Sequence, residues 1–231
     1  MRHKSCLFAA LSILMVATLA PTPIAAEVSV SNLFTDHMVL QRDVPVVVWG
    51  KAAAAEQVSI VLAGKTETTK ADDDGRWQVQ LPALKVGSGP HQLVIEGSNR
   101  IEINDILIGE VWVCSGQSNM AFAVSSANDP DLESLSANFP NIRIISVPQI
   151  GSQTPVDDFQ GKWETVTPET VKSFSAVGYF FGRQLHQTLN VPIGLIDTAW
   201  GGSACEAWVP REVLAEAGDY QELLAKWDDA A

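Results

Sequence analysis

A serine that follows a short apolar segment is the first residue of this sequence that could do chemistry. Residues 109–114 read Gly-Glu-Val-Trp-Val-Cys, and Ser-Gly-Gln-Ser-Asn follows at 115–119. This pattern predicts a strand buried on both faces, then a turn, with Ser118 at the strand's carboxyl end and at a helix N-terminus. Ligands collect there in open α/β sheets, and helix N–H groups can stabilise an oxyanion. Ser118 is therefore a candidate nucleophile; the alternative is that it only caps the helix.

A pair of glycines follows a second apolar segment. Residues 192–199 read Pro-Ile-Gly-Leu-Ile-Asp-Thr-Ala, and Trp-Gly-Gly-Ser comes next at 200–203. Glycine lets the backbone approach a ligand closely, although a plain turn explains the pair equally well. If both apolar segments are parallel strands of one sheet, their carboxyl ends meet at the same edge. Ser118 and the glycines would then belong to one site.

The elements around these segments predict the beginning of an α/β domain over 109–231. Besides the two strands, the patterns predict a strand at 141–147 and helices at 119–127, 130–137, 175–189, 210–217 and 220–231. Strands that alternate with helices form a parallel sheet. In the helix at 175–189 the spacing predicts one apolar face, made of Val177, Phe180, Phe181, Leu185 and Leu189.

Residues 27–108 instead predict a β-sandwich domain. Short apolar or alternating runs are separated by turn signals such as Asp72–Gly75 and Gly87–Pro90. Gln78 and Gln80 alternate with apolar neighbours over 77–81, which is typical of a strand with one wet and one packed face.

Residues 1–26 have the pattern of a secretory signal peptide. Arg2 and Lys4 precede an almost wholly apolar run over 7–20, and small residues follow, with a cut expected after Ala26. The run is 14 residues long, whereas a membrane span needs about 20. We therefore expect a secreted or periplasmic protein that is not inserted in a membrane after cleavage.

Composition argues against several classes of partner and cofactor. The net charge of −12 argues against nucleic acid as a partner. The sequence has neither a Cys/His cluster at zinc spacing nor a glycine-rich phosphate loop, so it predicts no metal and no cofactor. Beyond the signal peptide it keeps Cys114 and Cys205. A disulfide between them is one reading, and two buried free thiols is the favoured one.

Three segments together resemble a known family, the sialate O-acetylesterases, a branch of the SGNH hydrolases. They are GEVWVCSGQSNM at 109–120, FSAVGYFFGRQLH at 174–186 and VPIGLIDTAWGGSACEAW at 191–208. The first resembles the family's nucleophile block and the last its glycine block. The resemblance covers essentially the whole chain after the signal peptide.

The resemblance implies a flavodoxin-like, three-layer α/β/α hydrolase domain that removes O-acetyl groups from sugars without a metal. Ser118 would be the nucleophile. The oxyanion hole would be the N–H of Ser118 and an N–H of Gly201 or Gly202. Gln117 and Asn119 match the motif and would shape the turn. By the same resemblance, the Glu and Trp at positions 206 and 208 would be structural.

The sequence also departs from the family. It contains neither the family's Asp-x-x-His segment, which carries the base, nor its Gln-Gly-Glu block. Of its histidines, His3 lies in the signal peptide, His37 and His91 are expected at turns or strand edges, and His186 on a solvated helix face. Asp197 ends the second strand, but nothing at family spacing supports it as a triad member. We therefore expect a truncated chain with little or no activity of its own.

Two other functions remain open from the sequence. The product could be a non-catalytic carbohydrate-binding protein or pseudoenzyme that uses aromatics of the sandwich such as Trp49 or Trp77, although core packing explains these better. It could also be an acetylxylan esterase, since the sequence does not separate sialic acid from acetylated polysaccharide.

Overall fold

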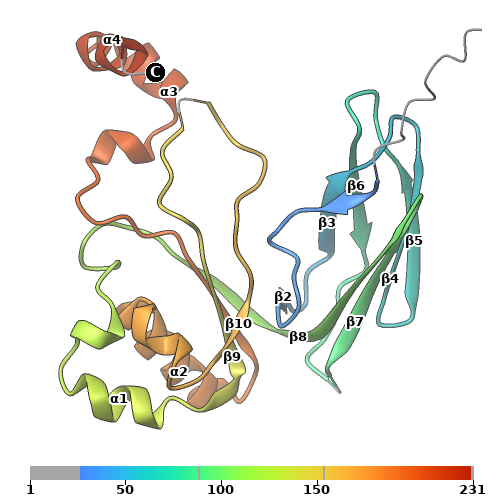
Figure 1. Cartoon of the computed structure of the whole chain (residues 1–231), viewed down its shortest axis with the longest axis horizontal. Coiled ribbons are helices and arrows are strands. Elements are labelled where there is room, and N and C mark those ends of the chain that lie inside the picture. Colours follow the sequence, from blue (N-terminus) through green and yellow to red (C-terminus); the bar gives the residue numbers. More distant parts are fainter. Residues whose placement is uncertain (1–26, 88, 153, 230–231) are drawn as a thin grey trace, which may run out of the picture.

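The computed structural model describes residues 27–87, 89–152 and 154–229, so the predicted signal peptide lies outside the described residues. A β region formed by the N-terminal part adjoins a region of strands and helices (Figure 1). The strands are β1 (Ser29–Val30), β2 (Val39–Gln41), β3 (Val46–Lys51), β4 (Gln57–Leu62), β5 (Lys65–Lys70), β6 (Arg76–Leu81), β7 (His91–Glu96), β8 (Arg100–Cys114), β9 (Phe139–Ser146), β10 (Glu164–Val166) and β11 (Ile193–Asp197). The α-helices are α1 (Pro130–Ser136), α2 (Ala176–Leu189), α3 (Arg211–Ala217) and α4 (Gln221–Asp229). None of these described helices is long and apolar enough to cross a membrane.

The N-terminal β region contains two groups of antiparallel strands. One is a sheet in the order β1-β3-β6, and the other has the order β8-β7-β4-β5. Side chains of both groups share one apolar core, among them Val48 and Leu81 from the first and Ile60 and Ile95 from the second. The predicted alternation in β6 is confirmed, because its residues are exposed and buried in turn.

Strand β8 joins this region to the rest of the chain. Its first part, Arg100–Ile106, pairs antiparallel with β7, and its last part, Glu110–Cys114, pairs parallel with β11. Between them, residues 107–109 pair parallel with β2. One uninterrupted strand therefore leads from the N-terminal β region into the region of strands and helices, as Figure 1 shows. The turn that carries Ser118 follows its last residue, Cys114.

The predicted parallel sheet is confirmed. Strand β11 lies between β9 and β8 and is parallel to both, while β10 extends the sheet antiparallel to β9. The predicted strand at 141–147 corresponds to β9, and the predicted helices at 130–137, 210–217 and 220–231 correspond to α1, α3 and α4.

Helix α2 lies on this sheet, and the predicted apolar face is confirmed only in part: Phe180 and Leu185 pack against the core, and the other three residues do not. Val177, Phe181 and Leu189 are 48%, 41% and 45% exposed. The buried residues are instead Ala176, Gly178, Tyr179 and Gly182. A Cβ at Gly178 would lie 2.9 Å from the sulfur of Cys114, and one at Gly182 would lie 2.7 Å from Leu195. The glycines let the helix backbone approach the sheet, and a search for large apolar residues does not detect such a face.

Two further predictions around the candidate nucleophile are wrong. Residues 119–127 do not form an α-helix: a turn leads into a short 3₁₀ helix, Val124–Ser126. The preceding segment is not buried on both faces either, because Trp112 and Val113 are 44% and 63% exposed. Among the described strands only β11 pairs with Glu110–Cys114. An apolar run predicts a strand, but it does not determine which elements cover it.

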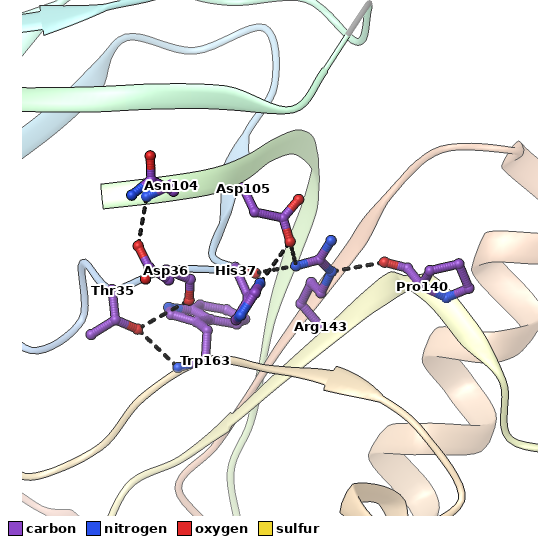
Figure 2. A network of polar contacts seen from close by, with 8 residues as sticks. All are labelled: Thr35, Asp36, His37, Asn104, Asp105, Pro140, Arg143 and Trp163. Atoms are coloured by element: carbon purple, nitrogen blue, oxygen red, sulfur yellow. Dashed lines mark hydrogen bonds and ion pairs between the residues drawn. The ribbon is translucent and has the colours of Figure 1, made fainter. Parts of the chain in front are cut away.

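A polar network connects the two regions (Figure 2). The guanidinium of Arg143 in β9 donates to Asp105 Oδ2 at 2.7 Å and to the carbonyl oxygen of Pro140 at 2.8 Å. His37, which lies in a turn as predicted, bonds the same carboxylate at 2.6 Å. Hydrogen bonds from Arg143 first, and then from His37, lower the pKa of Asp105. The network fixes the N-terminal segment, β8 and β9 to one another.

Candidate active site

The turns after β8 and β11 lie side by side. Cys114 and Asp197 are register partners at the carboxyl ends of these strands. The N–H of Thr198 donates to the carbonyl oxygen of Cys114 at 3.0 Å, and the N–H of Trp200 donates to that of Gly116 at 2.9 Å. The prediction that both segments end at the same sheet edge is thus confirmed.

This arrangement brings Ser118 next to the glycine pair. A Cβ at Gly201 would lie 3.6 Å from Ser118 Cα and 3.7 Å from Ser118 Oγ. Ser118 is exposed. Among the described residues neither Gly201 nor Gly202 has an acceptor for its N–H. Gly202 has a φ of 80°, a conformation that favours glycine.

Gln117 links the two turns. Its amide oxygen accepts from the N–H of Ser118 at 3.1 Å, and its amide nitrogen donates to the carbonyl oxygen of Ser203 at 3.3 Å. Asn119 is exposed in the same turn. The turn is thus held by the Gln117 side chain and by a bond from the N–H of Ala121 to the carbonyl oxygen of Gln117, rather than by a helix that begins at Ser118.

Burial changes the ionisation of two groups behind this turn. Desolvation raises the pKa of Asp197, whose carboxylate accepts from the N–H of Ala199 at 2.9 Å. Desolvation, together with the charge of Asp197, raises the pKa of Cys114 to about 11. Both cysteines are free thiols. Cys114 is buried as expected, but the expectation for Cys205 is wrong: it is exposed, in the short 3₁₀ helix Cys205–Trp208, none of whose residues is buried.

The histidines of the described region belong to elements other than the turn of Ser118. His186 lies near the C-terminal end of α2, where its Nδ1 bonds the carbonyl oxygen of Val191 at 2.7 Å and its ring packs edge-on against Phe139. It is partly buried, so the expected solvated face is wrong. His91 begins β7, and His37 belongs to the network of Figure 2. In the described part of the chain no three His, Cys, Asp or Glu side chains are grouped as metal ligands.

A cavity of about 850 Å³ adjoins the site, and the sequence pattern does not predict it. It is lined by the segment after β9, by the loop after β11 and by parts of α3 and α4; its lining includes Trp200, Ser203 and Trp208. The signal in the sequence was the pair of tryptophans that flank the glycines. The sequence alone predicts a turn at Trp200 and a structural role for Trp208. It does not show that distant segments come together to form a concave surface.

The chain is similar to known carbohydrate esterases. Residues 108–231 match the family model described as "Carbohydrate esterase, sialic acid-specific acetylesterase". The sialate O-acetylesterases of Homo sapiens and Mus musculus are 33% and 32% identical to the chain, each over 81% of it. The chain spans 40% and 38% of these relatives' own length. A carbohydrate acetylesterase from Xanthomonas citri superposes with a TM-score of 0.78 at 38% identity, over 83% of this chain and 44% of that one.

Proposed function

The chain belongs to the sialate O-acetylesterase family, and on this premise we propose that it carries the nucleophile half of a carbohydrate O-acetylesterase site. The observation that carries the proposal is the contact between the turn of Ser118 and that of Gly201 at the ends of two parallel strands. It supports a serine nucleophile with backbone N–H groups beside it.

Ser118 Oγ attacks the carbonyl carbon of a sugar-bound acetyl group, and its proton passes to a base. The tetrahedral intermediate collapses when the sugar oxygen leaves and takes up a proton. Water then hydrolyses the acetyl-enzyme, which releases acetate and restores the Ser118 hydroxyl. The carboxylate of Asp197 accepts a hydrogen bond from the N–H of Ala199 in the turn after β11, and we assign it no role in these steps.

The oxyanion is held by the N–H of Ser118 and by that of Gly201 or Gly202. The amide oxygen of Gln117 already accepts from the N–H of Ser118. A substrate oxyanion takes the place of this oxygen, and the bond from the N–H of Ala121 to the carbonyl oxygen of Gln117 keeps the backbone of the turn in position. Such fixed donors stabilise charge that develops in the transition state.

The base that activates Ser118 comes from polypeptide other than the residues described. His37 and His186 are hydrogen-bonded elsewhere, His91 lies at the start of β7, and a serine hydroxyl is a weak nucleophile without a base. We therefore expect the 231-residue chain to be inactive alone and to become active when the polypeptide is extended by a segment with an Asp-x-x-His sequence.

Ester hydrolysis tests both parts of the proposal. The coding sequence beyond codon 231 is read, and the 231-residue chain and an extended chain are assayed on an acetylated sugar, each with Ser118 and with Ser118→Ala. We expect activity only in the extended chain with Ser118. Undiminished activity of the extended Ser118→Ala variant would show that Ser118 is not the nucleophile. Robust turnover by the 231-residue chain would contradict the proposal that the base comes from additional polypeptide.

Two finer assignments accompany this function. We propose that the two groups of antiparallel strands form a β-sandwich domain over 27–108. Of its candidate sugar-binding aromatics, Trp77 is 2% exposed and donates to the carbonyl oxygen of Lys51, so Trp49 is the residue on which a non-catalytic binding function would depend.

We also propose that residues 1–26 direct export of the protein. N-terminal sequencing of the mature protein tests this proposal, and the first residue should be Glu27.

A further inference from the structure

The connection between β9 and β10 reaches from the candidate active site to the N-terminal β region. Residues 147–152 and 154–155, which we call the cavity segment, line the cavity beside the site. Within this segment Gln149 Nε2 donates to the carbonyl oxygen of Ala199 at 3.0 Å. One end of the connection is therefore attached to the loop that carries the glycine pair.

The other end of the connection is attached to the N-terminal β region by Asp158. Its Oδ1 accepts from Ser31 Oγ at 3.0 Å and from the N–H of Asn32 at 2.9 Å, and its Oδ2 accepts from Asn32 Nδ2 at 3.0 Å. Hydrogen bonds to an ionised carboxylate are about twice as strong as those between neutral groups. Three donors on one carboxylate thus fix this end of the connection.

Two aromatic residues that follow Asp158 strengthen the attachment. Phe159 packs against the N-terminal apolar core, and Trp163 is a buried member of that core. The indole Nε1 of Trp163 donates to the carbonyl oxygen of Leu33 at 2.8 Å, and its N–H donates to Thr35 Oγ1 at 2.9 Å (Figure 2). The residues from Asp158 onward therefore pack with the N-terminal β region, although they come after β9 in the chain.

Between its two ends the connection is held by few contacts. The hydrogen bonds of the described residues 150–152 and 154–156 stay within the connection. Ile150 and Val156 are 75% and 69% exposed. A segment with few buried contacts opens at little cost in free energy, so the position of the cavity segment depends on the two ends.

We propose that Asp158 is a positioning residue, through which the N-terminal β region holds one wall of the candidate active site in place. It acts through the cavity segment and not on the reacting atoms. The effect on hydrolysis rests on the proposed esterase function. The attachment itself does not, because it is a property of the folded chain.

The neighbouring Asp157 provides a matched control. It pairs with Lys51 at 3.6 Å and with Arg76 at 3.4 Å, and its side chain is 55% exposed. Exposed ion pairs of this kind contribute little to stability. Asp157→Ala removes the same charge from the same connection and leaves the hydrogen bonds of Asp158 in place.

Hydrogen–deuterium exchange of the 231-residue chain tests the attachment. In Asp158→Ala the amides of the cavity segment should exchange about tenfold faster than in the wild type, because the segment opens more often. Asp157→Ala should exchange like the wild type. Circular dichroism checks that each variant is folded. Wild-type exchange in Asp158→Ala, or equal acceleration in Asp157→Ala, would overturn the proposal.

Two milder variants test the same contact and carry the test if Asp158→Ala does not fold. Asp158→Asn keeps an oxygen that accepts from Ser31 and from the N–H of Asn32, so its exchange should lie between those of wild type and Asp158→Ala. Asn32→Ala removes the Nδ2 donor from the N-terminal side and should also accelerate exchange. Combined with Asp158→Ala it should add little, since the two residues share one contact. Wild-type exchange in both single variants, or additive effects in the double variant, would contradict the attachment.

Kinetics of the active, extended protein test the positioning role. Asp158→Ala should raise KM for an acetylated oligosaccharide about tenfold and leave kcat unchanged, because the wall is displaced and the reacting groups are not. Its kcat/KM for p-nitrophenyl acetate, a small ester, should equal that of the wild type. A general structural defect would lower the activity towards both esters. Accelerated exchange with an unchanged KM for the oligosaccharide would overturn the positioning role.

The variant Ser118→Ala separates this proposal from the proposed function. The effect of Asp158→Ala on exchange should be the same with and without the Ser118 hydroxyl. If hydrolysis depends on Ser118 but Asp158→Ala exchanges like the wild type, the esterase stands and the attachment fails. If exchange depends on Asp158 but the extended chain hydrolyses no acetyl ester, the attachment stands and the esterase fails.

Discussion

Ser118 and Gly201 lie side by side although they follow different strands: a Cβ added at Gly201 would lie 3.7 Å from Ser118 Oγ. That distance is ordinary van der Waals contact, so an added methyl group fits the fold. It would still occupy space beside the hydroxyl that a tetrahedral intermediate needs. Position 201 therefore allows catalysis and stability to be tested separately.

Gly201→Ala should leave the melting temperature unchanged and slow ester hydrolysis by the active, extended protein. A small displacement of the reacting groups costs about tenfold to a hundredfold in rate. Steady-state kinetics and thermal unfolding measure the two effects. Gly87→Ala is the control, because the nearest atom to its added Cβ would be 3.8 Å away in Lys85. Unchanged kcat/KM in Gly201→Ala would contradict the assigned oxyanion region.

Gly109→Ala should instead destabilise the fold. Its Cβ would overlap the backbone carbonyl of Pro192, where β8 and β11 begin to pair. Backbone cannot move aside as a flexible side chain can, and overpacking of this kind costs about 1–3 kcal/mol. Urea unfolding measures the loss of free energy relative to Gly87→Ala. Equal midpoints for the two variants would disprove this packing constraint.

The two cysteines should differ in reactivity towards iodoacetamide. Cys205 is exposed, whereas Cys114 is buried with a pKa raised to about 11, and the thiolate is the reactive form. At pH 8 the native protein without its first 26 residues should be labelled at Cys205 alone, and at both residues after unfolding. Mass spectrometry of the peptides locates the label. Rapid native labelling of Cys114 would conflict with its burial by α2.

Removal of the carboxylate of Asp105 should destabilise the protein in a pH-dependent way. Hydrogen bonds from Arg143 and His37 lower its pKa in the folded state, so its ionised form is the stabilising one. This contribution is present above the unfolded-state pKa of about 4 and is lost as the pH falls below it. The difference in melting temperature between wild type and Asp105→Asn should therefore be present at neutral pH and shrink below about pH 4. The exposed Asp73→Asn variant should show neither effect.

The sequence predicted the candidate site better than it predicted the packing around it. Apolar runs and glycines follow from local chemistry, so both strand ends and the shared edge of Ser118 and the glycine pair were predictable. The buried face of α2 was predictable only in part, because Phe180 and Leu185 pack against the core but Ala176, Gly178 and Gly182 bring the helix backbone closest to the sheet. The cavity at Trp208 was not predictable either, because its walls come from four separate segments of the chain.

The continuity of strand β8 limits where the N-terminal β region can be exchanged between homologous proteins. Since a single strand pairs with β7, β2 and β11 in succession, residues 108 and 109 mark no hinge. A one-residue insertion there would shift the register of Glu110–Cys114 against β11, move the side chains of this segment to the opposite faces of the sheet and displace the turn of Ser118 from the glycine loop. The length of β8 thus determines where the nucleophile lies. Exchange of N-terminal β regions between homologues therefore requires a junction outside this strand.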